Sequence, residues 1–355
     1  MRFVYILTAI ILLYGCNNPA GEGEKYVDKF PREINLEFKE FQTPPVLFYI
    51  SDMIVLDDVM VALDMKTDTF FHIFELPSLD YCGGSTIHGN GPDDEISISP
   101  FIGRIDPHSF YYRSINQVKI ASYNKATKNI VIKSQQALPP EYLNIYNLFI
   151  MNGNVYGYSM EMTSTNREYL GFNFASKEIF DFGHDFPSIH IPVPPTKLNM
   201  IFAKIMAGKP DGRRFAALYD KIPLLRIQDQ NGKLIRDVWY SNKQRSLSVY
   251  MQDEPNPSDL MNITVNYQRI NTTDKYIYGL YSGKTQEEIK QTDDYGFEIH
   301  VWDWDGQPIV RYILNQPVNS FTVSPDDAYI IGSSFQHYDK LYKAEIQPDY
   351  TYTSE

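Results

Sequence analysis

A hairpin pattern that recurs about every fifty residues constrains the fold of this chain more than any other feature. Its two clearest copies are LLRIQDQNGKLIRDVWY (Leu224 to Tyr240) and EIHVWDWDGQPIVRYIL (Glu298 to Leu314). In each copy an alternating strand leads through Asn-Gly or Asp-Gly into a second apolar strand. This is the strongest short-range hairpin signal, and it predicts a type I′ turn with positive φ at both central residues. A repeat of this period predicts stacked or radially arranged β modules.

Weaker copies of the hairpin precede these two, and all five are marked by polar or turn-forming residues. The turns are predicted near Ser78, Ala126, Ser176-Lys177, Asn231 and Asp305. The first three spacings are 48, 50 and 55 residues, and the last is 74. The segment KTQEEIKQTDDYG (Lys284 to Gly296) is polar and poor in β-formers, so we attribute the long interval to an inserted loop there.

A second alternating segment precedes each hairpin pattern, and six such segments indicate six modules. They are DDVMVALDM, HSFYYRSI, GNVYGYSM, RRFAALYD, DKYIYGLYS and DAYIIGSS. Aromatic residues form 14% of the chain, which suits half-buried pleated surfaces. No helical periodicity is sustained after the N-terminus. We therefore predict an all-β fold, a six-bladed β-propeller of four-stranded antiparallel blades over residues 33–347, followed by a C-terminal tail at 348–355.

The segment INLEFKEF (Ile34 to Phe41) alternates and comes before the first module. We expect it to complete the last blade, beside KLYKAEI (Lys340 to Ile346). Such closure of the ring leaves only short, protected strand edges.

The N-terminus has the layout of a secretory signal. Arg2 precedes FVYILTAIILLYG, an apolar run that ends before Cys16 and is shorter than the roughly 20 residues of a membrane span. Leu13-Tyr14-Gly15-Cys16 resembles a bacterial lipobox, although Tyr14 is larger than the usual residue. We predict a lipoprotein signal peptide at 1–15, lipid attachment at Cys16, and a flexible polar tether at 16–32. The alternative is an ordinary signal peptide with an incidental cysteine.

Charge and cysteine content limit the partners. A net charge of −12 argues against nucleic acid, which requires basic patches. The chain has two cysteines, and lipid on Cys16 would leave Cys82 without a disulfide partner. Cys82 stands beside two glycines at a strand end, which favours a small packing residue over a reactive thiol assisted by His88. We expect a monomer.

The stretch GGSTIHGNGPDDEI (Gly83 to Ile96) contains Gly-x-Gly-Pro-x-x-Glu after the first hairpin. It resembles the Gly-x-Gly-Pro-Gly-Glu signature in the first blade of the TolB-like, six-bladed β-propeller lipoproteins of Bacteroidetes. Here Asp93 and Asp94 separate Pro92 from Glu95, so the glutamate comes one position late and the last glycine is missing. The final blade, FTVSPDDAYIIG, also matches the layout of that family. The resemblance implies a propeller fold and an outer-membrane lipoprotein of the cell envelope, but no activity.

The Gly-Pro loop has a structural and a functional interpretation. Gly89 and Gly91 would permit backbone angles closed to other residues, and Pro92 would stiffen the crossing between blades. Alternatively the loop binds ligand. In that case His88, Asp93, Asp94 and Glu95 are the predicted contacts, together with loops His184 to His190 and Lys284 to Gly296. No Lys-Ser/Thr pair follows, which excludes a phosphate-binding loop.

No catalytic constellation is found, and no catalytic residue or cofactor is predicted. The seven histidines form no HExxH or HxH pair. His184, Asp185 and His190 are weak candidates for a zinc or calcium site, against the more common interpretation as solvated loop residues. Asp303 and Asp305 mimic a calcium loop, but position twelve is Leu314 instead of glutamate, so they fit turn residues better.

Two classes of function therefore stay open. The first is a binding or scaffold module, anchored to the membrane by its N-terminal lipid, for a protein, peptide or glycan. The second is a metal-dependent hydrolase or lyase of the lactonase kind, with its site in the central channel. Convergence of His, Asp and Glu side chains from several blades on that channel would favour the enzyme.

Overall fold

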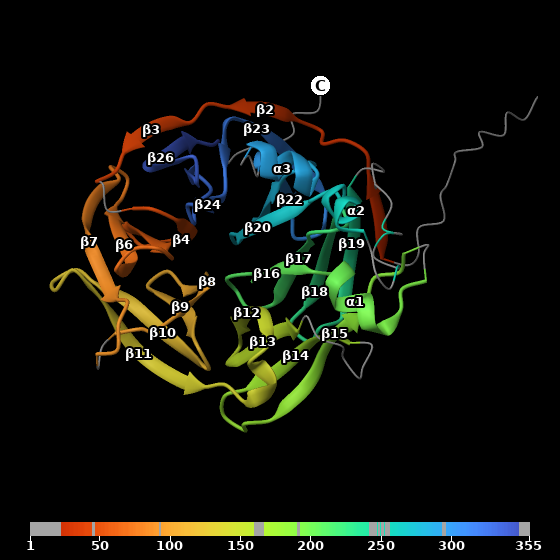
Figure 1. The fold of residues 1–355 in the computed structure, drawn as a ribbon, viewed down its shortest axis with the longest axis horizontal. Coiled ribbons are helices and arrows are strands. Elements are labelled where there is room, and N and C mark those ends of the chain that lie inside the picture. The colour runs from red at the N-terminus through yellow and green to blue at the C-terminus, as the bar shows by residue number, and fades with distance from the viewer. Residues whose placement is uncertain are drawn as a thin grey trace, which may run out of the picture.

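The computed structural model describes residues 23–44, 47–91, 94–159, 167–189, 192–240, 247, 249, 252, 256–292 and 296–347. Six β-sheets stand around a central channel, and they form the ring seen in Figure 1. In five sheets four consecutive strands pair antiparallel, and in the sixth three consecutive strands are joined by a strand from the N-terminal segment. The predicted all-β, six-bladed propeller is confirmed.

Each blade is built from consecutive strands with the first strand next to the channel. The first three blades contain β4 (Ile50–Leu56), β5 (Val59–Asp64), β6 (Thr69–Glu75), β7 (Asp80–Ile87); β8 (Ile98–Asp106), β9 (Ser109–Ser114), β10 (Gln117–Asn124), β11 (Asn129–Ala137); and β12 (Ile145–Met151), β13 (Asn154–Ser159), β14 (Arg167–Asn173), β15 (Ile179–Asp185). The last three contain β16 (Lys204–Gly208), β17 (Arg214–Tyr219), β18 (Leu224–Asp229), β19 (Leu234–Tyr240); β20 (Tyr267–Thr272), β21 (Tyr276–Tyr281), β22 (Gly296–Asp303), β23 (Pro308–Val318); and β24 (Ser320–Val323), β25 (Tyr329–Ser334), β26 (His337–Glu345).

The repeated sequence segments occupy equivalent places in the blades. The six alternating segments form the second strands β5, β9, β13, β17, β21 and β25. All five predicted turns join a third strand to a fourth. Second strands lie between two other strands, and their faces pack against neighbouring blades, so nearly all of their residues are buried. This double burial explains why these segments carry the clearest repeat.

The N-terminal segment covers the outer edges of three blades, and Figure 1 shows it running around the rim in red. The strand β3 (Lys39–Gln42) pairs antiparallel with β26 and completes the sixth blade, as expected from the sequence. The strand β2 (Glu33–Leu36) instead pairs parallel with β23 of the fifth blade. The predicted closing strand is therefore split between two blades.

A third edge strand lies within the segment that was assigned to a flexible tether. This strand, β1 (Glu24–Val27), pairs parallel with β19 of the fourth blade. A flexible tether is therefore the wrong description of these four residues. The outer strand of a blade presents unpaired N–H and C=O groups, and the passing chain satisfies them.

The turns differ from the predicted type I′ geometry. In the turn of the fourth blade, Gly232 has a φ of +78°, while Asn231 has no positive φ. The Asp229 carboxylate accepts hydrogen bonds from the backbone N–H groups of Asn231 and Lys233, both at 2.9 Å. This makes a three-residue loop, a type I turn that ends in a left-handed glycine. The copy between Asp303 and Gln307 has the same hydrogen bonds and the same left-handed glycine.

A type I′ turn does occur elsewhere in the chain. Asn152 and Gly153, with φ angles of +52° and +74°, join the first two strands of the third blade. There the strand partners Met151 and Asn154 flank a two-residue loop. Loop length therefore decides the turn type, and the Asn-Gly dipeptide alone does not.

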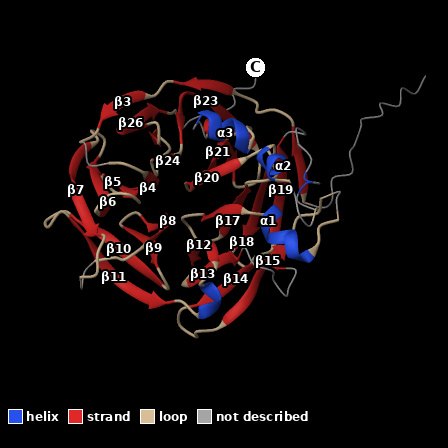
Figure 2. Ribbon diagram, viewed as in Figure 1, coloured by secondary structure: helices blue, strands red, loops and turns tan. Residues whose placement is uncertain are grey.

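Short helices occur in the connections between strands, and Figure 2 shows them in blue. In the described ranges they include α1 (Leu198–Ile201), α2 (Pro257–Met261) and α3 (Gln286–Thr292), with 3-10 turns at Pro140–Tyr142 and Pro195–Lys197. The helix α3 lies inside the predicted polar loop. Thr285 and Glu288 cap it reciprocally, because each side chain accepts the other's backbone N–H. The long interval between turns thus contains α3 and also the β19–β20 connection that carries α2.

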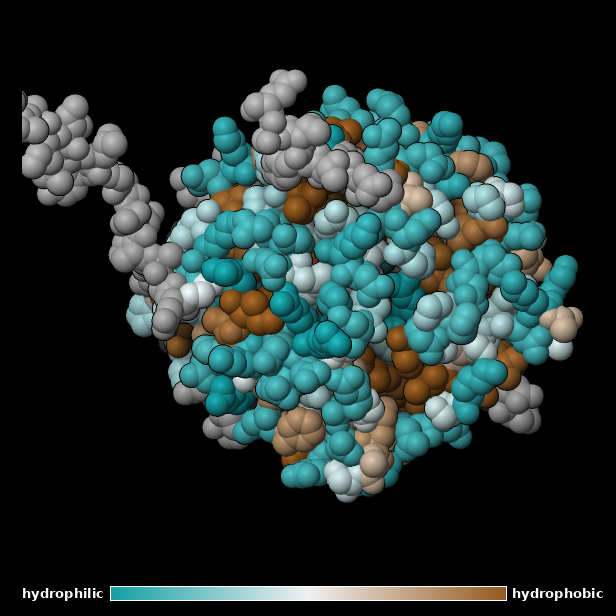
Figure 3. Space-filling model, turned by 180° about the vertical axis from the view of Figure 1, so that it is seen from behind, coloured by the Kyte–Doolittle hydropathy of each residue, from teal (hydrophilic) through white to brown (hydrophobic). Residues whose placement is uncertain are grey.

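The apolar side chains are packed mainly between blades. The buried residues form five clusters, each drawing on more than one element. The face shown in Figure 3 is mostly hydrophilic, with hydrophobic residues in separate patches. Among the residues that the structure describes, no helix is long and apolar enough to cross a membrane.

The turn of the fourth blade should be more sensitive to substitution than the type I′ turn. A Cβ added at Gly232 would lie 2.6 Å from the backbone N of Gly183 in the third blade, whereas one added at Gly153 meets nothing within 4 Å. Gly153→Ala therefore carries only backbone strain, about 1 kcal/mol, and Gly232→Ala adds an overpacking cost of about 1–3 kcal/mol. Urea denaturation measures both, and equal losses of stability would contradict the packing of this turn on its neighbour.

Candidate functional site

The two ends of the ring carry different connections. Because the strands alternate in direction, connections after first and third strands lie at one end, called here the turn end. Connections after second and fourth strands lie at the other, called here the loop end. All three loops predicted to bind ligand lie at the loop end, since they follow β7, β15 and β21. The topology therefore brings them to the same side of the propeller.

Glu95 of the Gly-Pro loop is buried against the second blade. Its carboxylate accepts hydrogen bonds from Tyr112 Oη at 2.8 Å and Lys119 Nζ at 2.6 Å, and also from the Ser114 hydroxyl. The donors come from β9 and β10, so this glutamate fastens the loop between blades to the blade that follows. The geometry gives Glu95 a structural role.

The glycines of the same loop lie close to the Asp94 side chain. Neither Gly89 nor Gly91 has a left-handed φ, so the predicted need for unusual backbone angles is wrong. A Cβ at Gly89 would instead lie 2.4 Å from Asp94 Oδ2, which accepts the Gly91 N–H at 2.8 Å. His88 is exposed and packs its ring 5.2 Å from that of Phe70. Asp93 and Pro92 lie outside the described residues.

The residues proposed as weak candidates for a metal site make contacts of other kinds. The backbone N–H of His184 donates to Gln228 Oε1 at 2.9 Å, and its imidazole Nδ1 lies 3.3 Å from the Asp185 carbonyl oxygen. The Asp185 carboxylate lies 3.5 Å from Arg167 Nη1. His190 lies outside the described residues. Across the described ranges, no group of three or more His, Cys, Asp or Glu is arranged to hold a metal ion.

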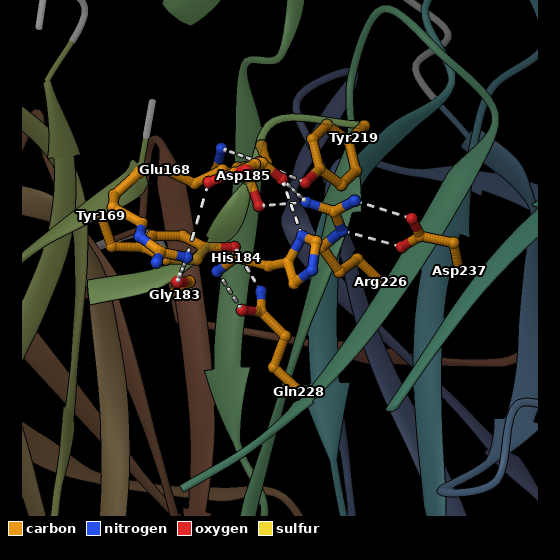
Figure 4. Close-up of polar contacts among 11 residues, drawn as sticks. Glu168, Tyr169, Gly183, His184, Asp185, Tyr219, Arg226, Gln228 and Asp237 are labelled. Atoms are coloured by element: carbon orange, nitrogen blue, oxygen red, sulfur yellow. Dashed lines mark hydrogen bonds and ion pairs between the residues drawn. The ribbon is translucent and has the colours of Figure 1, made fainter. Parts of the chain in front are cut away.

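A buried ionic cluster that was not predicted from the sequence lies close to His184 and is made of Glu168, Lys204, Arg226 and Asp237. Figure 4 labels Glu168, Arg226 and Asp237 of this cluster. Lys204 Nζ lies 2.8 Å from one oxygen of Glu168, and Arg226 Nη1 lies 2.7 Å from the other. Arg226 also binds Asp237 through two hydrogen bonds of 2.7 Å. The two positive and two negative charges balance, and they join the third blade to the fourth.

The surroundings of this ionic cluster shift its ionisation. Burial by itself raises the pKa of Glu168, but Lys204 and Arg226 outweigh it and hold that pKa below its ordinary value. Burial lowers the pKa of Lys204, although Glu168 opposes this. Four aromatic rings enclose the Lys204 ammonium at 4.9–5.4 Å, contributed by Tyr158, Tyr169, Phe186 and Tyr219. Every charge of the ionic cluster is thus matched within the protein, which indicates a structural role.

The central channel holds a cavity of about 400 Å³. It is lined by residues of all six first strands and by the turns Asn152-Gly153 and Lys209–Gly212. Both turns follow first strands, so the cavity extends toward the turn end. The predicted ligand loops and this cavity therefore lie toward opposite ends of the propeller.

Three charged side chains occur among the strand residues that line the cavity. Asp52 accepts the backbone N–H groups of Met53 and Ile102, both at 3.0 Å, and burial raises its pKa to about 6. Arg269 donates to the carbonyls of Ser51 and Gln268 at 3.1 and 2.8 Å. Arg104 donates to the carbonyl of Thr272, across the channel, at 3.3 Å. None of the three was predicted as a site residue.

Replacement of Glu168 tests the buried ionic cluster. Glu168→Gln leaves Lys204 and Arg226 with one excess positive charge in the interior, and we expect a loss of about 3–5 kcal/mol in unfolding free energy. Glu178→Gln, at an exposed position, should change it by less than about 0.5 kcal/mol. Because the folded pKa of Glu168 is depressed, its contribution should be present at neutral pH and lost as pH falls through that lowered pKa. Urea titrations at several pH values measure this, and a mild, pH-independent effect would contradict it.

Comparison with known proteins agrees with the geometry. The family model of TolB-like six-bladed propellers matches residues 46–326. A solved structure of a DUF4221 family member from Bacteroides vulgatus has a TM-score of 0.60 at 11% identity, covering 88% of this chain and 97% of that one. A Bacteroides fragilis protein described as exported has a TM-score of 0.55 at 13% identity, covering 91% and 98%.

At these identities the two solved structures show the fold alone. A search of curated proteins gave no match. The family model, in contrast, spans most of the propeller from the first blade to the sixth. The chain belongs to the TolB-like six-bladed propeller family.

Proposed function

We propose that this protein is a binding module of the bacterial cell envelope, lipid-anchored at Cys16 to the outer membrane. Three observations support the location. The first fifteen residues have the layout of a secretory signal, Cys16 ends the apolar run, and one structural neighbour is described as exported. The ligand is a protein, peptide or glycan.

The observation that carries the binding role is the central cavity. Its volume of about 400 Å³ falls in the range of small-molecule sites, which is enough for the end of a peptide or a short glycan. Hydrogen bonds to the backbone already fix its charged side chains. Backbone N–H groups donate to the Asp52 carboxylate, and the Arg269 guanidinium donates to backbone carbonyls. Groups fixed in this way favour recognition, because little ordering remains to be done when a ligand binds.

The lipid anchor is tested by Cys16→Ser. One residue removes the attachment point, so the variant should leave the membrane fraction and lose incorporation of labelled lipid. Cys82→Ser is the matched control and should behave as the wild type. Membrane association of both variants, with no label in the wild type, would contradict the anchor.

The binding role is tested with mature protein on peptide and glycan arrays, beside metal analysis and assays for hydrolase and lyase turnover. Gly208 borders the cavity, and a Cβ there meets only Phe149 Cδ2 at 4.0 Å, so Gly208→Leu should fold and narrow the cavity. We expect saturable binding to an array ligand that is left chemically unchanged, weakened about tenfold or more by Gly208→Leu. Stoichiometric zinc or calcium with turnover would instead establish the enzyme alternative.

A further inference from the structure

We infer that the part of the ligand that enters the central cavity is a carboxylate on a compact organic group, and that Arg104 and Arg269, which line the cavity from opposite blades, supply the positive charge that attracts it. This inference rests on the proposed binding function and specifies its ligand chemistry. The two arginines belong to β8 of the second blade and β20 of the fifth, which face each other across the ring.

Arg269 is held in a fixed orientation. Its guanidinium donates to Ser51 O in the first blade and to Gln268 O, and it lies over the Phe101 ring of the second blade at 5.5 Å from the centroid. Its Nε is buried with no hydrogen-bond acceptor in the described part of the chain. A charged group braced in this way is ready to bind an anion without first losing side-chain freedom.

Arg104 has spare hydrogen-bonding capacity. Its hydrogen bond within the described residues goes to Thr272 O, whereas a guanidinium has five N–H donors. Burial lowers its pKa, and Asp274 and Asp327 oppose this from a distance without a direct ion pair. A partly buried guanidinium with unused donors is stabilised by an anion, and its planar fork matches a carboxylate.

The charge of the cavity favours a ligand with a single negative charge. Lys209 and Asp211, at the turn end, pair with each other at 2.5 Å. Among the described residues that line the cavity, the remaining charges are Arg104 and Arg269 against Asp52, an excess of one positive charge. This excess is local, because the whole chain carries a net charge of −12.

The rest of the cavity lining suits the apolar part of an organic ligand. Apolar residues such as Ile150, Met206 and Val323 line the same cavity. A carboxylate with a compact apolar group therefore fits both parts of the cavity, whereas inorganic phosphate would leave this wall unused.

Asp52 makes the binding depend on pH. Its carboxylate accepts the backbone N–H groups of Met53 and Ile102 and interacts electrostatically with Arg269 and Tyr111, and burial raises its pKa to about 6. Above that pH its negative charge opposes a second carboxylate nearby. An acid with a carboxyl pKa of about 3.5 stays ionised at pH 5, so its affinity should rise as pH falls from 7 to 5.

The test is calorimetric titration of the mature chain with N-acetyl-leucine and with N-acetyl-leucinamide, which differ only in the charged group. We expect the acid to bind and the amide to bind at least about tenfold more weakly. Methyl glucuronide in a third titration distinguishes a sugar acid from an amino-acid type of ligand. Equal binding of acid and amide, or no binding of either by folded protein, would overturn the inference.

Variants of the charged lining residues assign the contacts, beside one control outside the cavity. Arg104→Gln should reduce the affinity for the acid about tenfold or more, whereas Arg213→Gln, exposed and outside the cavity, should not change it. Asp52→Asn should strengthen binding at pH 7 and abolish its dependence on pH. Wild-type affinity in Arg104→Gln would contradict the assignment even if Arg269→Gln failed to fold. Catalytic turnover would contradict the proposed binding function, but the acid would still bind more tightly than the amide. Failure of the proposed function and failure of this inference are therefore distinguishable.

Discussion

Closure of the ring is the constraint on which the rest of the structure depends. The strand β26, near the end of the chain, finds its outer partner in β3, near the beginning, through four residue pairs from Lys39–Lys343 to Gln42–Lys340. The Lys340–Glu40 ion pair at 2.7 Å joins the same two strands. On the inner side, β24 packs beside β4 and brings the sixth blade against the first. A cavity at the centre exists only because these contacts bring together first strands from the whole chain.

Much of the fold was predictable because it repeats. The second strands are buried on both faces, so the six apolar segments identified the blades, and the five turns fell where polar residues interrupt the pattern. The path of the N-terminal segment was not predictable in detail. Glu37 and Phe38 separate β2 from β3 and give no local sign that the chain passes from one blade to the next. The turns were misread because Asp229 and Asp303 accept backbone N–H groups, which leaves a positive φ only at the glycine.

The site was less predictable than the fold, for a physical reason. The predicted ligand-binding residues were sought in irregular loops, and these loops lie at one end of the ring. The groups with unusual surroundings lie on regular strands. Arg104 and Arg269 are 165 positions apart and line one cavity only because the ring closes, and Glu168 reaches Arg226 only because the third blade packs on the fourth. One signal was present: Arg226 and Lys204 stand directly beside apolar residues in their strands, a pattern typical of buried, paired charges.

The most direct test of this account is hydrogen exchange of β26 in two deletion variants. A variant lacking residues 17–30 loses β1 but keeps β2 and β3, whereas one lacking 17–42 loses all three edge strands. The account predicts slow exchange at Leu341 and Lys343 in the shorter deletion. In the longer one it predicts fast exchange there, together with loss of carboxylate binding in the channel. Equally slow exchange and unchanged binding in both variants would contradict the dependence of the cavity on ring closure.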